Sequence, residues 1–150
     1  MSKIKTAKDS SSPLKCFAFR LKPHEDLKEG IIAFAKKNRI HAGFILTCVG
    51  SVEQIHLRFA NRINGTLKSG YFEMVGLTGT FSGSSAHLHL IVADKMGKTM
   101  AGHLLKGTAV YTTAEIVVGS LPALQFGRKM DADSGYAELT VSKTKTRRKK

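Results

Sequence analysis

Apolar and polar residues alternate along much of this chain, which is the pattern of half-buried β-strands. In residues 52–60, Ile55, Leu57 and Phe59 recur at every second position, and we expect them to point into a core. Other short apolar segments predict further strands. These are residues 14–21, 43–50, 70–81, 86–94, 112–119, 124–130 and 136–141. The last two segments are expected to close the sheet, through a turn at residues 133–135.

Residues 27–35 follow a different period. Leu27, Ile31 and Phe34 recur at spacings of three and four, with lysines between them, as in an amphipathic helix. Acidic residues just before this segment suit the positive end of a helix dipole. We therefore predict an α+β fold, in which a mainly antiparallel sheet of about seven strands is flanked by one main helix and one or two short ones.

Length and composition indicate one folded domain with polar ends. The chain has 150 residues, of which 42% are hydrophobic, and this is enough for a single core. Residues 1–13 are polar and end in a Ser-Ser-Ser-Pro run, so we expect a disordered lead-in there. We assign residues 14–142 to the domain and residues 143–150 to a basic disordered tail.

The positive charge is concentrated at the two ends. The formal net charge is +13, and eight of these charges lie in residues 1–13 and 143–150. Such tails suit contact with phosphate backbones or nuclear import, and a solvated solubility tail is the alternative. The residues expected to make non-specific contact with nucleic acid are Lys143, Lys145, Arg147, Arg148, Lys149 and Lys150.

The chain shows no membrane or disulfide pattern. No apolar run approaches the roughly 20 residues that span a bilayer, and residues 1–8 lack the apolar stretch of a secretory signal. The two cysteines, Cys16 and Cys48, both fall in predicted strands, where we expect inert core thiols. We therefore expect no membrane contact and a location in the nucleus or cytoplasm.

Three of the six histidines lie in one predicted hairpin. His87 and His89 are two residues apart in a strand, so they point to the same face. A turn over residues 94–97 then folds the next strand back. If Ala93 pairs with Thr99, His103 lies opposite His89 and the three rings converge. If Ala93 pairs with Lys98 instead, His103 leaves the set.

These histidines fit two kinds of site. Three imidazoles on one face form a ligand set for a divalent metal such as zinc, with open positions left on the ion. The alternative is a packing device in which each ring is hydrogen-bonded. The spacing alone does not choose between them.

Two glutamates and one arginine are candidate partners of the histidines. Glu73 lies in an apolar strand, and it would orient an imidazole, ligate a metal or act as a base on bound water, or else face solvent. The same alternatives hold for Glu115. Arg128 pairs with one of these carboxylates or is exposed. A metal-dependent enzyme that uses His87, His89, His103 and Glu73 is thus one hypothesis.

Several catalytic patterns are missing. The chain has no Gly-x-Ser-x-Gly elbow and no phosphate-binding Gly-x-x-x-x-Gly-Lys loop. A cupin pattern fits only in part, because the acidic residue after the His-x-His pair, Asp94, falls in the turn. Catalysis is therefore not the first expectation.

The order of the motifs resembles that of the PPC domain, the plants and prokaryotes conserved domain, also called DUF296. The matching motifs are Gly70–Gly79, His87-Leu88-His89, Gly102-His103-Leu104, Ala114–Val117 and Phe126–Leu139. The resemblance covers about residues 14–142. It implies an antiparallel sheet flanked by helices, assembled as a homotrimer, with a metal at His87, His89 and His103 in some members.

The resemblance also implies partners. Plant members join the domain to AT-hooks, bind AT-rich DNA in the nucleus and use the domain for trimer formation and contacts with other nuclear proteins. Their partner-contact segment corresponds to Gly70, Tyr71, Phe72, Glu73, Met74 and Val75. This chain lacks the Arg-Gly-Arg core of an AT-hook, which leaves phosphate contacts as its route to DNA. We therefore expect a trimeric, DNA-associated binding module.

Overall fold

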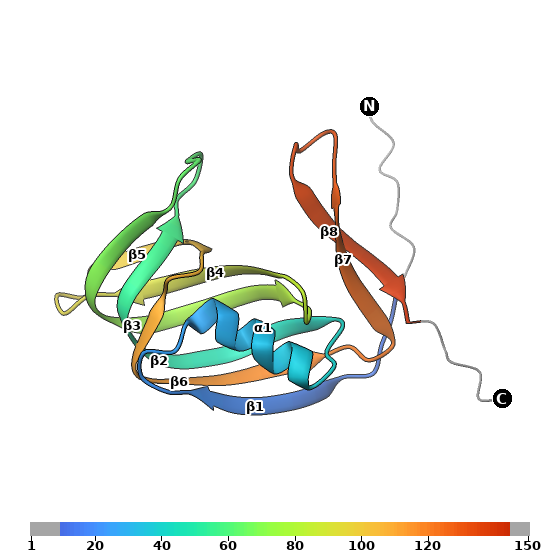
Figure 1. Cartoon of the computed structure of the whole chain (residues 1–150), viewed down its shortest axis with the longest axis horizontal. Helices are drawn as coiled ribbons and strands as arrows, with labels where there is room; N and C mark the ends of the chain where they lie inside the picture. The colour runs from blue at the N-terminus through green and yellow to red at the C-terminus, as the bar shows by residue number, and fades with distance from the viewer. Residues whose placement is uncertain (1–9, 145–150) are drawn as a thin grey trace.

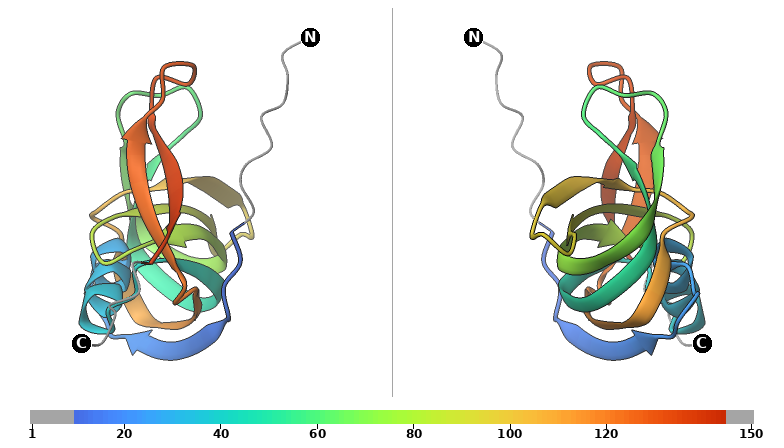
Figure 2. Two further views of the ribbon diagram at one scale, coloured as in Figure 1. Left: turned by 90° about the vertical axis from the view of Figure 1, so that its right-hand side faces the viewer. Right: turned by 90° about the vertical axis from the view of Figure 1, so that its left-hand side faces the viewer.

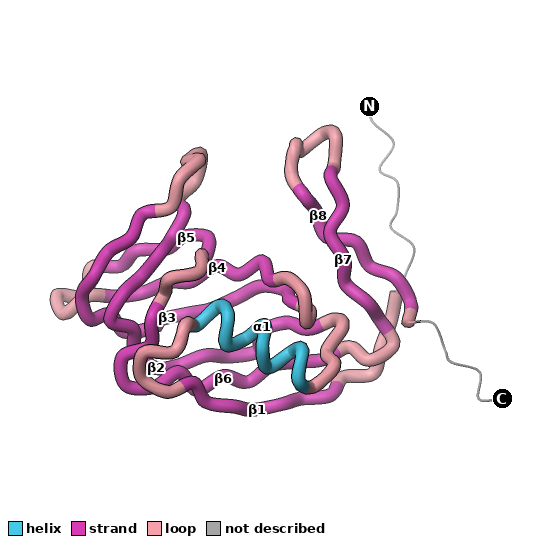
Figure 3. The backbone as a smooth tube through the Cα atoms, viewed as in Figure 1, coloured by secondary structure: helices cyan, strands magenta, loops and turns pink. Residues whose placement is uncertain are grey.

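The computed structural model describes residues 10–144, which form eight strands and one helix (Figures 1 and 3). In chain order these elements are β1 (Lys15–Leu21), α1 (Leu27–Lys37), β2 (Gly43–Arg58), β3 (Thr66–Phe81), β4 (Ala86–Ala93), β5 (Thr99–Leu104), β6 (Ala109–Ser120), β7 (Leu124–Met130) and β8 (Ala137–Lys143). The α+β class is confirmed. Within residues 10–144 α1 is the sole helix, so the one or two further short helices that we predicted are absent from this part of the chain, where turns and bends join the strands instead.

The main sheet is antiparallel, and four of its strands close on themselves. Its order is β1-β6-β2-β3-β4-β5, and β5 also pairs with the end of β2. There Leu57 lies opposite Leu104 and Arg58 lies opposite His103. Strands β2 to β5 therefore form a small barrel, which β6 and β1 extend as a curved sheet (Figure 2). Fully buried side chains fill the interior, including Leu57, Leu88 and Leu104.

The helix covers one face of the curved sheet (Figure 1). Its predicted apolar face is buried, with Leu27, Ile31 and Ala35 fully shielded from solvent. Asp26 caps its first turn, because one carboxylate oxygen accepts a hydrogen bond from the Glu29 amide at 2.8 Å. At 11 residues α1 is too short to cross a membrane, and residues 10–144 contain no helix long and apolar enough to do so.

Strand β2 joins two segments that we predicted as separate strands. It runs unbroken past Gly50, with irregular pairing between Gly50 and Val52 and again between Val52 and Gln54. Each irregularity shifts the phase of the alternation. Val52, which the pattern placed on the outer face with Gln54, is therefore fully buried, and Ile55 and Leu57 are buried as predicted.

The last two strands do not close the main sheet, contrary to our prediction. Strands β7 and β8 pair only with each other and form an arm beside the barrel (Figures 1 and 2). The predicted turn is present, and Asp131 accepts hydrogen bonds from the amides of Asp133 and Ser134. The arm is fixed at its base, where the Phe126 amide donates to the His41 carbonyl at 2.9 Å. All residues of β8 are exposed.

Gly79 holds β3 and β4 at close range next to the histidines. Its φ is +137°, and a Cβ at this position would overlap the carbonyl oxygen of His87. We expect Gly79→Ala to lower the free energy of unfolding by about 2–4 kcal/mol, because it combines backbone strain with a clash between strands. Chemical denaturation measures the change.

Gly76→Ala in the same strand is the matched control. A Cβ there would make only ordinary contact with Ile91, at 3.6 Å from its Cδ1 atom. We expect the control to cost less than about 1 kcal/mol. Equal losses for the two variants would contradict the role assigned to Gly79.

Candidate metal centre

The register of the histidine hairpin is the one that brings the three rings together. Ala93 pairs with Thr99, and His89 lies directly opposite His103. His87 and His89 project from β4 on the outer side of the barrel, while Leu88 and Leu90 between and beyond them fill the core. The first of the two predicted registers is thereby confirmed.

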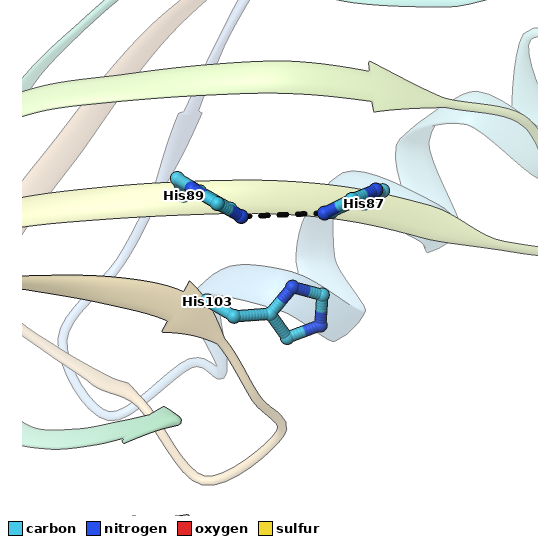
Figure 4. Close-up of side chains that lie close together, drawn as sticks. All are labelled: His87, His89 and His103. Carbon is cyan, nitrogen blue, oxygen red and sulfur yellow. Dashed lines mark hydrogen bonds between the residues drawn. The ribbon is translucent and has the colours of Figure 1, made fainter. Parts of the chain in front are cut away.

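The three rings face one another (Figure 4). One nitrogen of each lies within 4.8 Å of the others, and the Nε2 atoms of His87 and His89 are 3.2 Å apart. Ring centroids are separated by 4.9 Å for His87 and His103 and by 5.6 Å for His89 and His103. Figure 4 shows one nitrogen of His103 turned toward the other two rings. The set thus presents three nitrogen donors to one point.

His103 carries the clearest sign of a missing partner. Its Nδ1 atom is buried and has no hydrogen-bond partner among the described residues. Leaving such an atom unsatisfied costs roughly 1–3 kcal/mol. A packing device would satisfy each ring, so this orphaned nitrogen favours a metal ligand over the structural alternative. The residues therefore fit a divalent ion, which His87, His89 and His103 would hold.

Burial and nearby charges disfavour the protonated forms of His87 and His103. Burial lowers the pKa of His103 to about 4, with smaller contributions from His87 and from the cations Lys28 and Arg58. Burial also lowers the pKa of His87, followed by the charge of Arg128 and then His89. An imidazole binds a metal only in its neutral form, so the lowered pKa of His103 keeps this donor available below neutral pH.

The candidate carboxylates do not join the histidines. Glu73 lies opposite Ala93 in β4, five residues along β3 from Thr78, which faces His89. That spacing corresponds to roughly 16 Å of strand. Glu115 lies in β6 between Arg20 of β1 and Val49 of β2, on the far side of the sheet. The enzyme hypothesis therefore loses the base that we had assigned to it.

Arg128 lies at the site, but it pairs with no candidate carboxylate. It is half-buried, and its guanidinium donates to the hydroxyl of Thr80 at 3.1 Å. Thr80 in turn lies opposite His87. Arg128 therefore reaches from the β7–β8 arm to the rim of the histidine cluster.

A pocket of about 510 Å³ opens beside the histidines. Six of its lining residues are Arg58, His87, His103, Arg128, Tyr136 and Glu138. Sequence reasoning missed Arg58, Tyr136 and Glu138. Arg58 reaches the site because β2 pairs with β5. Tyr136 and Glu138 reach it because the β7–β8 arm lies beside the barrel. No local sequence pattern marks either of these long-range contacts.

The predicted partner-contact segment is half core and half surface. Phe72 and Met74 are buried, whereas Tyr71, Glu73 and Val75 alternate with them on the outer face. The Tyr71 ring lies 4.4 Å from that of Tyr111 in β6, measured between centroids. Only the outward-pointing residues are available to a partner.

The structure confirms the prediction for one cysteine and corrects it for the other. Cys48 is buried, and burial raises the pKa of its thiol to about 12, so it is inert as expected. Cys16 is exposed, contrary to our prediction, because the alternation of the edge strand β1 turns Phe17 and Phe19 inward instead. Of the predicted basic tail, Lys143 is exposed at the end of β8, and the other five residues lie outside the described residues.

Fold and site together define a small antiparallel β-barrel domain with an external histidine cluster. The chain belongs to the family of the Plants and Prokaryotes Conserved (PCC) domain, whose family model matches residues 8–122. This is the domain that the order of motifs resembles.

Two curated relatives contain the matching segment within a longer chain. The chain is 41% identical over 130 residues to the bifunctional protein GlmU of Synechococcus sp. strain JA-3-3Ab, covering 87% of this chain and 21% of the relative. It is 30% identical over 135 residues to AT-hook motif nuclear-localized protein 13 of Arabidopsis thaliana, covering 80% of this chain and 29% of the relative. The chain thus spans less than a third of either relative.

Solved structures share the fold across nearly the whole chain. A hypothetical protein from Salmonella enterica is 39% identical with a TM-score of 0.87, covering 89% of this chain and 97% of that chain. A metal-containing protein from Archaeoglobus fulgidus is 24% identical with a TM-score of 0.76, covering 89% and 99%. A protein from Bacteroides thetaiotaomicron, provisionally named as DNA-binding, is 23% identical with a TM-score of 0.73, covering 87% and 98%.

The lowered pKa of His103 predicts a pH dependence of the metal-free protein. Between about pH 6.5 and 4 the unfolded chain takes up a proton that folded His103 does not, so the free energy of unfolding falls as the pH falls through this range. Denaturation of metal-free protein across these pH values measures the loss. His103→Asn should reduce it, and an unchanged pH profile in this variant would contradict the assignment.

Proposed function

We propose that this chain is a metal-binding PCC-domain module in which His87, His89 and His103 hold one divalent ion such as zinc. The observation that carries the proposal is the convergence of three imidazole nitrogens within 4.8 Å, one of them buried without a hydrogen-bond partner. The metal-containing relative from Archaeoglobus fulgidus supports it. Three protein ligands leave coordination positions open, so a bound ion would supply Lewis acidity to a further ligand.

We further propose that the module is a homotrimer. Its support is a set of exposed apolar side chains on the neighbouring strands β6, β2, β3 and β4, where a contiguous patch would mark a protein interaction site. These side chains include Leu46, Val49, Tyr71, Val75, Ile91 and Tyr111. The partner-contact residues Tyr71, Glu73 and Val75 lie on the outer face of one of these strands, β3, and we assign them to contacts with another copy or with other nuclear proteins.

Association with DNA is the third element of the proposal. The net charge of +13 and the nuclear AT-hook relative from Arabidopsis favour it, as does the provisional name of the relative from Bacteroides. Since no Arg-Gly-Arg core is present, contact would be made to phosphates by the basic ends. This mode would place the protein with nucleic acid in the nucleus or cytoplasm.

The metal proposal predicts one zinc ion per chain. Protein reconstituted with zinc and freed of excess ion should retain it in a native mass spectrum, and His89→Ala should lose it because one of three ligands is removed. His41→Ala is the matched control, since His41 is exposed and lies outside the cluster. Zinc content that is substoichiometric in the parent protein, or unchanged by His89→Ala, would contradict the site.

The same spectrum tests the assembly. We expect a mass of three times the 16.3 kDa chain. Val75→Glu should shift it to the monomer, because a charge would be buried in the interface. Lys95→Glu, in the exposed β4–β5 turn, should leave it unchanged.

The DNA proposal predicts binding that depends on salt but not on sequence. Full-length protein should shift random and AT-rich duplexes equally at low salt, and the shift should weaken by roughly a thousandfold between 50 and 200 mM salt if six phosphates are contacted. Replacing the six basic residues of positions 143–150 with glutamine should reduce this salt dependence. If the full chain gives no shift at low salt, it does not bind DNA.

A further inference from the structure

The pocket beside the histidines gathers polar groups from several parts of the chain. Arg58 comes from the end of β2, while His87 and His103 come from β4 and β5. The β7–β8 arm adds Arg128 and Glu138. At about 510 Å³ the pocket has the size of sites that take small molecules.

Neither of the two arginines forms an ion pair within the part of the chain that the structure describes. The ion pairs there are His24 with Glu53 and Lys106 with Glu29. Arg128 donates one hydrogen bond, to Thr80, and Arg58 donates one long bond of 3.4 Å to the Arg62 carbonyl. Since a guanidinium carries five N–H donors, most donors of these two pocket-lining residues have no hydrogen-bond partner within residues 10–144.

We propose that this pocket binds a small molecule by an oxyanionic group, a carboxylate or a phosphate, held between Arg58 and Arg128. Planar guanidinium groups match such oxyanions with paired hydrogen bonds. The proposal rests on the metal site proposed above only in part, because His87 and His103 form one wall of the same pocket but the arginines bind the anion without an ion.

Glu138 narrows the class of ligand. Its carboxylate lines the same pocket and would repel a simple anion, whereas it accepts a hydrogen bond from a hydroxyl or an ammonium group. The ligand that suits this pocket therefore carries a hydrogen-bond donor as well as its oxyanion, as hydroxy acids and amino acids do.

The charges also couple the anion to the metal. Two arginines beside the histidine cluster oppose the arrival of a divalent cation, and an anion between the arginines removes part of that repulsion. By linkage, each ligand then raises the affinity for the other by the same factor. The pocket would thus take an anion more tightly when the histidines hold an ion.

Calorimetric titration with defined probes tests the proposal. Metal-free and zinc-loaded protein are titrated separately with lactate, propionate and inorganic phosphate. We expect saturable binding to both forms of the protein, with higher affinity for the zinc-loaded form. The ratio of the affinities for lactate and phosphate decides between the carboxylate and phosphate classes of ligand. Arg128→Gln and Arg58→Gln should each weaken binding by roughly tenfold to a hundredfold, the effect of losing a hydrogen bond to a charged group.

Two further variants serve as a control and as a test of the role of Glu138. Arg20→Gln is the matched control, because Arg20 also donates to a threonine hydroxyl, that of Thr113 at 2.9 Å, but lies in β1 away from the pocket. It should bind like the parent. Glu138→Gln changes an exposed strand residue, and it should tighten propionate binding and reduce the preference for lactate over propionate.

The outcomes separate this proposal from the metal site. Arginine-dependent binding to metal-free protein, with no zinc retained, would uphold the pocket and overturn the metal site. If the protein retains one zinc ion per chain but binds none of the probes saturably, the metal site is upheld and the anion pocket is overturned. Binding that is equal in the parent protein, Arg58→Gln and Arg128→Gln would overturn the pocket.

Discussion

The pairing of β5 with two strands is the constraint on which the rest of this structure depends. β5 pairs antiparallel with β4 from Thr99 to His103 and also meets the end of β2, which closes the barrel. This closure buries Leu57, Leu88 and Leu104 on the inside. Because strand side chains alternate, the same register that fills the core sets His89 opposite His103 on the outside. Packing and ligand geometry are therefore fixed by one set of hydrogen bonds.

Because the histidine site is built on paired strands, its backbone needs little rearrangement to bind an ion. His87 and His89 are held two residues apart on one strand, and the leucines between and beyond them are fully buried, so the backbone beneath the rings is fixed by the core. Repulsion between the rings of His87 and His103 is limited, since burial lowers the pKa of both and so favours their neutral forms. The orphaned nitrogen of His103 is a stability cost that only a bound partner would recover.

Local periodicity predicted the helix and the positions of most strands, because these depend on residues close in sequence, whereas it left the register of the histidine hairpin open and divided β2 in two. The predictions were wrong where contacts between residues far apart in the sequence determine the structure. The bulges around Val52 reverse the alternation of β2, and no pattern of apolar residues marks them. Strands β7 and β8 alternate like strands of the main sheet, yet they pair only with each other. Their position outside that sheet depends on the hydrogen bond to the His41 carbonyl, a distant contact that no local pattern marks. Arg58 became a site residue through barrel closure, and Glu73 was excluded by register.

The charges around the histidines argue against a metal ion acting alone. Arg58, Arg128 and Lys28 all act on the cluster in the direction that disfavours positive charge on its rings. The same charges oppose a divalent cation at the same place, and Glu138, whose charge acts on His87 in the opposite direction, offsets only one of them. A site selected for tight metal binding alone would surround its ligands with acceptors, as carboxylates behind zinc-bound histidines do. The excess of positive charge is instead what an ion requires when it is bound together with an anion.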